Sequence, residues 1–149
     1  EDKKIVRQLL SDNNAIRKGE KLIDFDVYNL TNGKRKISKI IKDNNSFLFF
    51  WNPEYVTPMY IASRINYLSL KFPEIKFIQI RIDGNANNQI HKLDINNQFY
   101  IDNQSLANTF LTSKMPRAII INKEGVVTNG YASISSRKVY QQLKELDKN

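Results

Sequence analysis

The fold of this chain is decided by the stretch SFLFFWNPEYVTP, which covers Ser46–Pro58. Its apolar run, Phe47–Trp51, is too short to span a membrane and is rich in aromatic side chains, so it predicts a fully buried central strand. Pro53 ends that strand because it has no N–H to donate to a neighbouring strand. A helical pattern begins after Pro58. The stretch therefore predicts a strand, a short turn and a helix whose first N–H groups are free, an arrangement that suits a chemical site.

The chain is long enough for one domain with a substantial core, because it has 149 residues, of which 41% are hydrophobic. It contains no cysteine, which excludes disulfides, thiolate catalysis and cysteine-ligated metals. No apolar run is long enough to cross a membrane, and we expect no secretory h-region within this sequence. Because the chain starts at Glu1 rather than at Met, we expect a processed or trimmed form.

The net charge is +8, and the densest basic run is Lys34–Lys36, with Lys39 and Lys42 nearby. A positive charge of this size supports solubility and a weak attraction to acidic partners. Acidic residues are scattered through the rest of the chain, so we interpret the basic run as a solvated loop and helix face. The alternative is a nucleic-acid-binding patch.

The residues before the central stretch predict short elements. Apolar positions at helical spacing predict an amphipathic helix at about 2–17. A strand-like segment at 22–30 leads into a turn at 31–34, whose Asn-Gly pair is a strong hairpin signal. A single helical turn is expected at 37–41 and a loop at 43–45.

The residues after Pro58 alternate between helical and strand patterns. The apolar positions of the first predicted helix are Met59, Ile61, Ala62, Ile65, Leu68, Leu70 and Phe72, and those at 61, 65, 68 and 72 share one face. Next we predict a strand at 75–82, a short irregular helix around 90–95, a strand at 99–101 and a helix at 106–111. A hairpin follows, with a strand at 118–121, a turn at 122–125 and a returning strand that ends at Gly130 and Tyr131. The last predicted helix is capped within 133–136. Strands that alternate with helices favour an α/β fold, and the final hairpin makes the sheet mixed.

Several motifs occur in an order that resembles one known superfamily. They are Phe25 with Gly33-Lys34, Phe50-Trp51, Ile80–Asp83, Met115-Pro116 and Ile119–Gly125. Together they resemble the thioredoxin-like superfamily, specifically its exported thiol-disulfide oxidoreductases related to cytochrome maturation and to peroxiredoxins. The resemblance covers nearly the whole chain after Gly19. It implies a thioredoxin-like α/β fold, with a central mixed sheet flanked by helices and an N-terminal β-hairpin extension.

The resemblance also implies where the family's cysteines would fall. The family pattern Phe-Trp-x-x-Trp-Cys-x-x-Cys, placed on Phe50-Trp51, puts the cysteine slots at Tyr55 and Pro58 and the second tryptophan slot at Glu54. Another register takes Trp51 as the tryptophan before the first cysteine, which moves the slots to Asn52 and Tyr55. We prefer the first register because the helix positions after Pro58 then also match.

Neither register contains a thiol. Thiol-disulfide exchange and the peroxiredoxin reaction both start from a cysteine thiolate. The position at which many thioredoxins carry a buried, proton-accepting acid is Phe49. The resemblance therefore supports the fold and argues against the family's activity, so we predict that the chain is not an enzyme.

A groove beside the former cysteine turn is implied by the same resemblance. Met115-Pro116 matches the family's cis-proline loop, which offers backbone groups to an extended peptide, and we expect a cis bond before Pro116. Arg117 is predicted to be a solvent-exposed strand residue, with contact to an anionic group as the alternative. The residues predicted to bind a protein or peptide are Trp51, Glu54, Tyr55, Thr57, Pro58, Met115, Pro116 and Arg117. The competing interpretation is a turn kept only for folding.

Other residue patterns predict no chemical site. His91 is the only histidine, so neither a metal site nor a histidine base is predicted. Asp83 and Asp102 have no obvious partner carboxylate for acid–base chemistry. The five glycines are isolated and form no phosphate-binding loop, and the serines at 133–136 lack a nucleophile motif. We therefore predict no cofactor and no metal.

The leading hypothesis is a redox-inactive thioredoxin-like domain at residues 19–149 that binds a protein or peptide, with residues 1–18 as a helical lead-in. One alternative is an enzyme with cysteine-independent chemistry at Tyr55, Thr57 or Arg117, and another is a purely structural domain. The resemblance implies a bacterial cell-envelope location, either periplasmic or lipid-anchored. Nucleic acid is not expected as a partner, and membrane contact is expected only through an anchor outside this chain.

Overall fold

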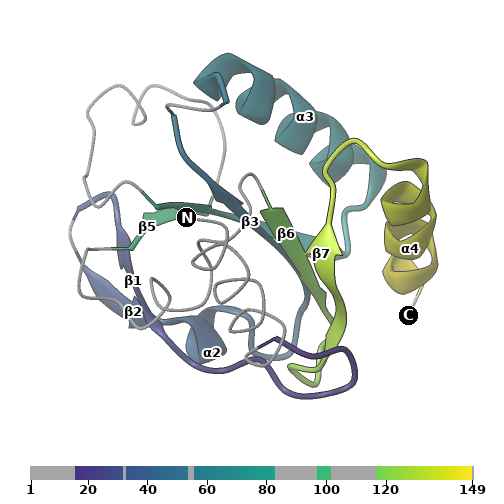
Figure 1. Cartoon of the computed structure of the whole chain (residues 1–149), viewed down its shortest axis with the longest axis horizontal. Helices are drawn as coiled ribbons and strands as arrows, with labels where there is room; N and C mark the ends of the chain where they lie inside the picture. The colour runs from purple at the N-terminus through teal and green to yellow at the C-terminus, as the bar shows by residue number, and fades with distance from the viewer. Residues whose placement is uncertain (1–15, 32, 54–55, 83–96, 102–116, 149) are drawn as a thin grey trace, which may run out of the picture.

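The computed structural model describes residues 16–31, 33–53, 56–82, 97–101 and 117–148. They form a mixed seven-stranded sheet in the order β2-β1-β5-β4-β3-β6-β7, together with three helices (Figure 1). The strands are β1 (Asp26–Asn29), β2 (Lys34–Lys36), β3 (Asn45–Trp51), β4 (Ile75–Arg81), β5 (Gln98–Tyr100), β6 (Arg117–Ile121) and β7 (Val127–Ala132). The helices are α2 (Ile37–Ile40), α3 (Pro58–Lys71) and α4 (Arg137–Asp147). The predicted α/β fold with a central mixed sheet is therefore confirmed.

Strand β3 lies at the centre of the sheet, as its aromatic run predicts. It pairs in parallel with β4, where Phe47 lies opposite Phe77, and in antiparallel fashion with β6, where Phe47 lies opposite Ile120. All seven residues of β3 are buried. A strand covered on both faces reads as a continuous apolar run rather than as an alternating one, which explains the sequence of β3.

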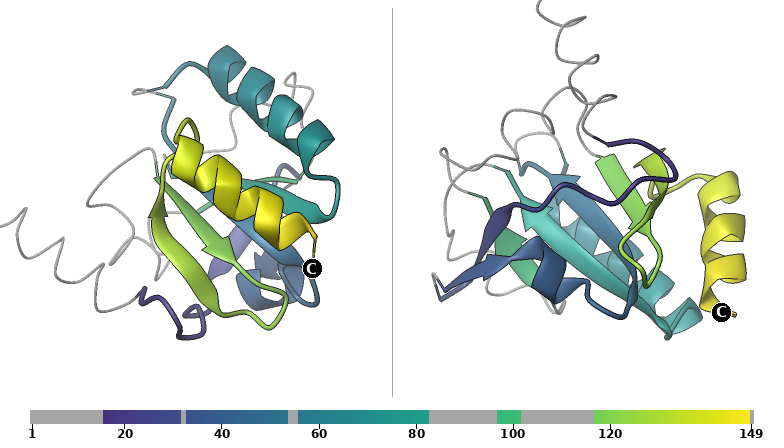
Figure 2. Two further views of the ribbon diagram at one scale, coloured as in Figure 1. Left: turned by 90° about the vertical axis from the view of Figure 1, so that its right-hand side faces the viewer. Right: turned by 90° about the horizontal axis from the view of Figure 1, so that it is seen from below.

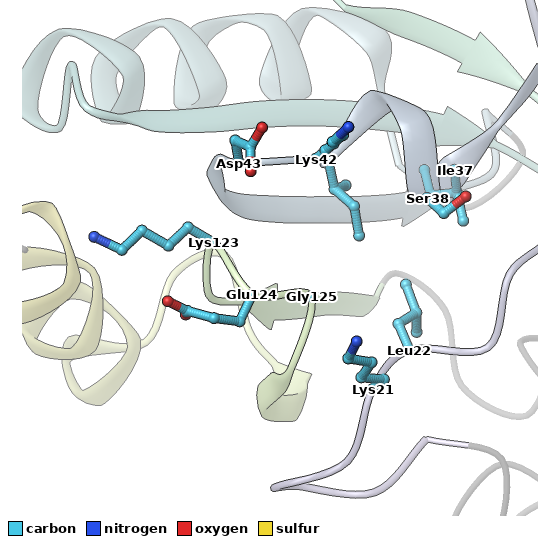
Figure 3. Close-up of a pocket in the computed structure, with 10 residues that line it drawn as sticks. Lys21, Leu22, Ile37, Ser38, Lys42, Asp43, Lys123, Glu124 and Gly125 are labelled. Carbon is cyan, nitrogen blue, oxygen red and sulfur yellow. The ribbon is translucent and has the colours of Figure 1, made fainter.

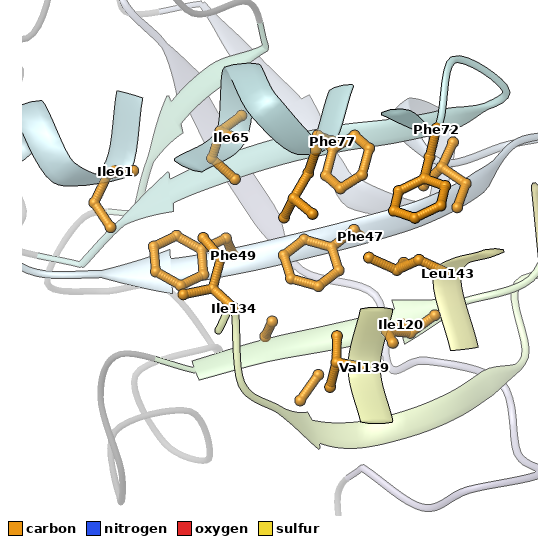
Figure 4. Packing of buried hydrophobic residues seen from close by; sticks show 14 of the residues in the cluster. Phe47, Phe49, Ile61, Ile65, Phe72, Phe77, Ile120, Ile134, Val139 and Leu143 are labelled. Atoms are coloured by element: carbon orange, nitrogen blue, oxygen red, sulfur yellow. The ribbon is translucent and has the colours of Figure 1, made fainter. Parts of the chain in front are cut away.

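The helices cover the two faces of the sheet. Helices α3 and α4 lie on one face and α2 lies on the other (Figures 1 and 2). Between the sheet and the first face, Ile65 of α3 and Leu143 of α4 belong to one core cluster with Phe47 (Figure 4). On the other face, Leu48 packs in a second cluster with Ile37 of α2. The alternating side chains of β3 thus serve two separate cores.

The segment before β1 is fastened to the edge of the sheet. The backbone N–H of Gly19 donates to the carbonyl of Val127 at 2.8 Å. Ile16 is buried beside Gly130, where an added Cβ would lie 3.1 Å from Ile16 Cγ2. This segment covers the start of β7, which is the last strand in the sheet order.

The hairpin and the last helix form as the sequence predicts. Strands β1 and β2 pair in antiparallel fashion, and Asn29 Oδ1 accepts hydrogen bonds from the N–H groups of Thr31 and Gly33 at 3.0 and 2.7 Å. The Ser136 hydroxyl caps α4 by accepting from the N–H of Val139 at 3.4 Å. Local side-chain hydrogen bonds of this kind explain why Asn and Ser occupy these positions.

Three predicted boundaries are wrong. Asn45 lies in β3 rather than in a loop, because its buried amide accepts from the N–H of Lys123 at 2.8 Å and donates to the carbonyl of Leu146 at 3.3 Å. Strand β7 continues past Gly130–Tyr131 to Ala132, where it still pairs with β6. The strand expected at 22–30 is confined to β1.

Four other expectations lie outside the described residues. They are the helix at 2–17 except for its last two residues, the helix near 90–95, the helix at 106–111 and the cis bond before Pro116. Among the helices that the structure does describe, none has both the length and the apolar character needed to cross a membrane.

Candidate functional site

The predicted site lies where β3 ends and α3 begins. The carbonyl of Trp51, the last residue of β3, accepts a hydrogen bond from the N–H of Ile82 at 3.0 Å. The N–H of Val56 donates to the carbonyl of Asn52 at 3.2 Å, so the chain turns back before the helix. These bonds fix the exit of the strand relative to the neighbouring β4.

Helix α3 begins with a cap and a proline. The Thr57 hydroxyl accepts from the N–H of Tyr60 at 3.4 Å, and Pro58 occupies the first helical position. Proline suits that position because its missing N–H would have no partner within the helix. The predicted strand and capped helix are therefore present, and Thr57 and Pro58 build the start of the helix.

The interior beneath this turn is apolar. The side chain of Trp51 is 1% exposed and belongs to the core cluster shared with α3 and α4. Phe49 is likewise 1% exposed, at the position where the resemblance would place a buried acid. Neither aromatic ring can take up a proton, so this part of the site offers no acid–base group.

Two buried polar residues of β4 lie beside this end of β3. Arg81 is in register with Trp51, and Gln79 is in register with Phe49. The Arg81 guanidinium carbon lies 5.9 Å from the ring centre of Tyr100 on β5. Within the described part of the chain, neither polar atom of the buried Gln79 amide has a hydrogen-bond partner.

The prediction that Arg117 is solvent-exposed is wrong. Its side chain is 2% exposed, because it packs against the neighbouring strand β7. The Arg117 Nε donates to the carbonyl of Gly130 at 2.9 Å, and the guanidinium carbon lies 3.9 Å from the ring centre of Tyr131. A guanidinium stacks on an aromatic ring more readily than an ammonium does, so an arginine fits this place well.

The exposed side of α3 carries apolar side chains that lie off the face predicted from positions 61, 65, 68 and 72. Met59 is 74% exposed and Tyr60 is 45% exposed, and both lie in the first turn of the helix. Leu70 is 85% exposed at the other end of the helix. A signal for Met59 and Tyr60 was present, because both positions fall off the face that carries Ile61 and Ile65.

The eight predicted binding residues divide into two groups. Trp51, Thr57, Pro58 and Arg117 are described, and they lie at the end of β3, the start of α3 and the start of β6. Because β6 is antiparallel to β3, Arg117 lies opposite Phe50, next to the end of β3. Glu54, Tyr55, Met115 and Pro116 lie outside the described residues.

The chemistry available at this place excludes the reaction that the resemblance associates with it. The whole chain has no cysteine, so it cannot form the thiolate that attacks a disulfide or a peroxide. The described residues also contain no group of three or more acidic or histidine side chains that could hold a metal ion. What the described part of the site does offer is the end of a buried strand, a capped helix start and exposed apolar side chains.

Comparisons with known proteins support the fold. The sequence matches no protein-family model and no curated protein. The structure is similar to that of a proposed thiol-disulfide oxidoreductase from Bacteroides vulgatus, with a TM-score of 0.73 and 18% identity over 88% of this chain and 97% of the other. It is also similar to a proposed thiol:disulfide interchange protein, DsbE, from Chlorobium tepidum, with a TM-score of 0.71 and 17% identity over 89% and 99% of the two chains.

A third similar structure is the exposed lipoprotein thioredoxin of Streptococcus pneumoniae. Its TM-score is 0.57, and the 18% identity extends over 83% of this chain and 100% of that chain. Identities this low establish the fold alone. The chain therefore has a thioredoxin-like fold, similar to that of thiol-disulfide oxidoreductases, and it lacks the cysteine on which their chemistry depends.

Proposed function

We propose that this chain is a redox-inactive thioredoxin-like domain that binds an extended segment of a protein at the end of β3. The observation that carries the proposal is the pair of exposed apolar side chains, Met59 and Tyr60, on the first turn of α3. They lie directly after Thr57 and Pro58, which hold the helix start in place. Exposed methionine and tyrosine side chains are common anchors in protein interfaces.

Because the chain has no cysteine, we assign this surface to recognition rather than to thiol chemistry. An extended peptide binds through backbone hydrogen bonds and side-chain contacts, neither of which requires a thiol in the binding protein. The buried aromatic residues Phe49 and Trp51 keep the strand end rigid, so the peptide would meet a preformed surface. In this proposal, Trp51 supports the surface from beneath, and Met59 and Tyr60 contact the peptide directly.

The location that fits this function is the bacterial cell envelope. Support comes from the fold, which is shared with a pneumococcal lipoprotein described as exposed, and with a proposed thiol:disulfide interchange protein. Fractionation of the native host, followed by detection of the chain, tests this location.

The binding proposal is tested with a random peptide library displayed on phage. The immobilised chain is panned, and the selected peptides are titrated into isotopically labelled protein while amide chemical shifts are followed. The expected result is a set of shifts confined to Trp51, Val56, Thr57, Met59 and neighbouring amides. Shifts confined to another surface would contradict the proposed site.

The test also separates the alternatives. A purely structural domain would yield no enriched peptide, while the same library panned on an established peptide-binding domain would serve as the positive control. Binding that persists after Met59 and Tyr60 are replaced by serine would exclude the first turn of α3 as the contact surface. Leu70→Ser is the matched control, because it removes an exposed apolar side chain from the other end of the same helix.

A further inference from the structure

The described part of the chain contains a hollow far from the end of β3. It has a volume of about 700 Å³ and lies between residues 21–22, the segment from α2 to Asp43, and the turn between β6 and β7 (Figure 3). The segment from α2 to Asp43 precedes the start of β3, and the turn after β6 lies at that same end because β6 is antiparallel to β3. The hollow therefore lies at the opposite end of β3 from the proposed peptide site. Volumes of 300–1,000 Å³ are typical of small-molecule sites, and this one falls within that range.

The three walls of the hollow are held in place by hydrogen bonds. Leu22 N–H donates to the carbonyl of Gly125 at 3.1 Å, which joins the first wall to the third. Asp24 holds Ser38 on the second wall, because its carboxylate accepts hydrogen bonds from the Ser38 N–H and hydroxyl at 3.0 and 2.8 Å. The Asn122 side chain accepts from the N–H of Val126 at 3.0 Å and shapes the turn. A ligand would therefore meet a largely preformed site.

The lining of the hollow combines aliphatic and cationic side chains. Its aliphatic residues, Leu22, Ile37 and Ile41, come from two of the walls, and none of the lining residues is aromatic. Ile37 and Ile41 are 1% and 5% exposed, so they form a floor that continues the core. An aliphatic floor of this kind favours a hydrocarbon chain, because burying methylene groups is favourable without any directional partner.

Three lysines stand on the rim, one from each wall. They are Lys21, Lys42 and Lys123. Lys21 and Lys42 form no ion pair with any other described residue, so their ammonium groups are available to an incoming anion. The carboxylates of Asp43 and Glu124 also lie on the rim. In Figure 3, Glu124 extends beside Lys123 and away from Lys21, which leaves the side of the hollow near Lys21 and Leu22 cationic.

We infer that this hollow binds an aliphatic chain that ends in an anionic group, with the chain on Leu22, Ile37 and Ile41 and the anion on the cationic side of the rim, beside Lys21. The ligand is a carboxylate or another singly charged head on an acyl chain. Such a chain could be a free amphipathic acid or part of an anionic lipid, and both present the same chemistry to the site. This site is separate from the peptide surface on α3 and does not depend on it.

The first test uses the unmodified chain and a series of straight-chain carboxylates. Butyrate, hexanoate and decanoate are titrated while amide shifts are recorded. We expect saturable shifts at Lys21, Leu22, Ser38, Ile41 and Gly125, with an affinity that rises by up to about fourfold for each added methylene. Decyltrimethylammonium, which carries the same chain on a cationic head, should bind at least fivefold more weakly than decanoate. Chain-length independence, equal binding of the cation, or shifts located elsewhere would each overturn the inference.

A second test removes the rim charges. Lys21→Gln/Lys42→Gln is expected to weaken decanoate binding by about fivefold or more, since the rim loses the positive charge beside the head and a second one on the facing wall. Lys71→Gln/Lys144→Gln, which removes two exposed lysines outside the hollow, should leave the affinity within twofold. Equal losses in the two variants would overturn the inference. Circular dichroism of each variant checks that the fold is intact. If a variant does not fold, the carboxylate series on the unmodified chain alone tests the inference.

The two sources of the ligand are distinguished with vesicles. Phosphatidylglycerol vesicles and neutral phosphatidylcholine vesicles are sedimented with the chain. Co-sedimentation with the anionic vesicles alone, lost in Lys21→Gln/Lys42→Gln, would identify a lipid as the source. Decanoate binding without co-sedimentation would identify a free amphipathic acid. Failure with both ligands would overturn the inference and would leave the peptide proposal untouched.

Discussion

Arg117 shows how a single residue changes the interpretation of the site. It directly follows Pro116 in the sequence, and a cation there invites the idea of an anion-binding role. In the structure its side chain is 2% exposed and is directed into contacts with β7. The stack on Tyr131, at 3.9 Å, joins the start of β6 to the sheet edge. Arg117 therefore stabilises the region beside the end of β3, and it is the exposed apolar residues of α3 that remain available for contact.

The stack between Arg117 and Tyr131 should be measurable as a coupling energy. Arg117→Met is expected to lower the free energy of unfolding by about 1–3 kcal/mol, because it leaves the Gly130 carbonyl without its donor. A double-mutant cycle with Tyr131→Leu should give a coupling of about 1 kcal/mol by urea denaturation. Arg137→Met, at an exposed position, should change stability by less than about 0.5 kcal/mol. A coupling near zero would contradict the stabilising role of the stack.

The sequence predicts burial well for some residues of the site and poorly for others. Phe49 and Trp51 stand in a continuous apolar run, so their burial follows from their neighbours in the chain. Arg117 is buried by Gly130 and Tyr131, which belong to a different strand, and by a hydrogen bond that no local pattern reveals. Long-range contacts of this kind determine whether a charged side chain is buried or exposed, and they can be seen only in the folded structure.

Helix α3 is the element on which the proposed function rests. Its buried face carries Ile61, Ile65 and Leu68, and the helical spacing in the sequence identifies that face correctly. The same spacing implies that Met59 and Leu70 point elsewhere, and they are 74% and 85% exposed. The sequence could therefore predict the orientation of the helix, whereas the exposure of its second apolar face required the arrangement of the neighbouring elements.

The start of α3 should depend on its cap. Thr57→Ala is expected to lower the free energy of unfolding by about 0.5–2 kcal/mol, because the Tyr60 N–H loses the hydroxyl that it binds. Thr57→Ser, which keeps a hydroxyl, should retain most of the stability. Chemical denaturation measures both variants. Equal stability of Thr57→Ala and the parent chain would show that the cap contributes nothing.

The position of the two cysteine slots can also be tested on this element. Pro58 is the first residue of α3, so a thiol at 58 would lie at a helix N-terminus, which lowers a thiol pKa. Tyr55→Cys/Pro58→Cys should therefore gain activity in the reduction of insulin disulfides by dithiothreitol. Asn52→Cys/Tyr55→Cys should stay at the level of the parent chain, which should show no turnover. Turnover by the parent chain would contradict its assignment as redox-inactive.

At the scale of the whole molecule, the sequence predicts the architecture better than it predicts the site. The central strand, the hairpin, the helices α3 and α4 and the final strand pair all follow from hydrophobic periodicity and turn residues. The site is built where β3, α3 and β6 come together, so its composition depends on contacts between distant segments. The hollow near Lys21 was not predicted for the same reason, since its three walls come from separate parts of the chain.

The measurement that tests the proposed function most directly is the affinity of a library-selected peptide for three forms of the chain. Isothermal titration calorimetry would compare the parent chain, Met59→Ser/Tyr60→Ser and Leu70→Ser. We predict that the double variant weakens binding at least tenfold, because truncated apolar anchors typically cost more than 1 kcal/mol each, and that Leu70→Ser binds within twofold of the parent. Equal affinities for all three forms would contradict a peptide-binding surface at the start of α3.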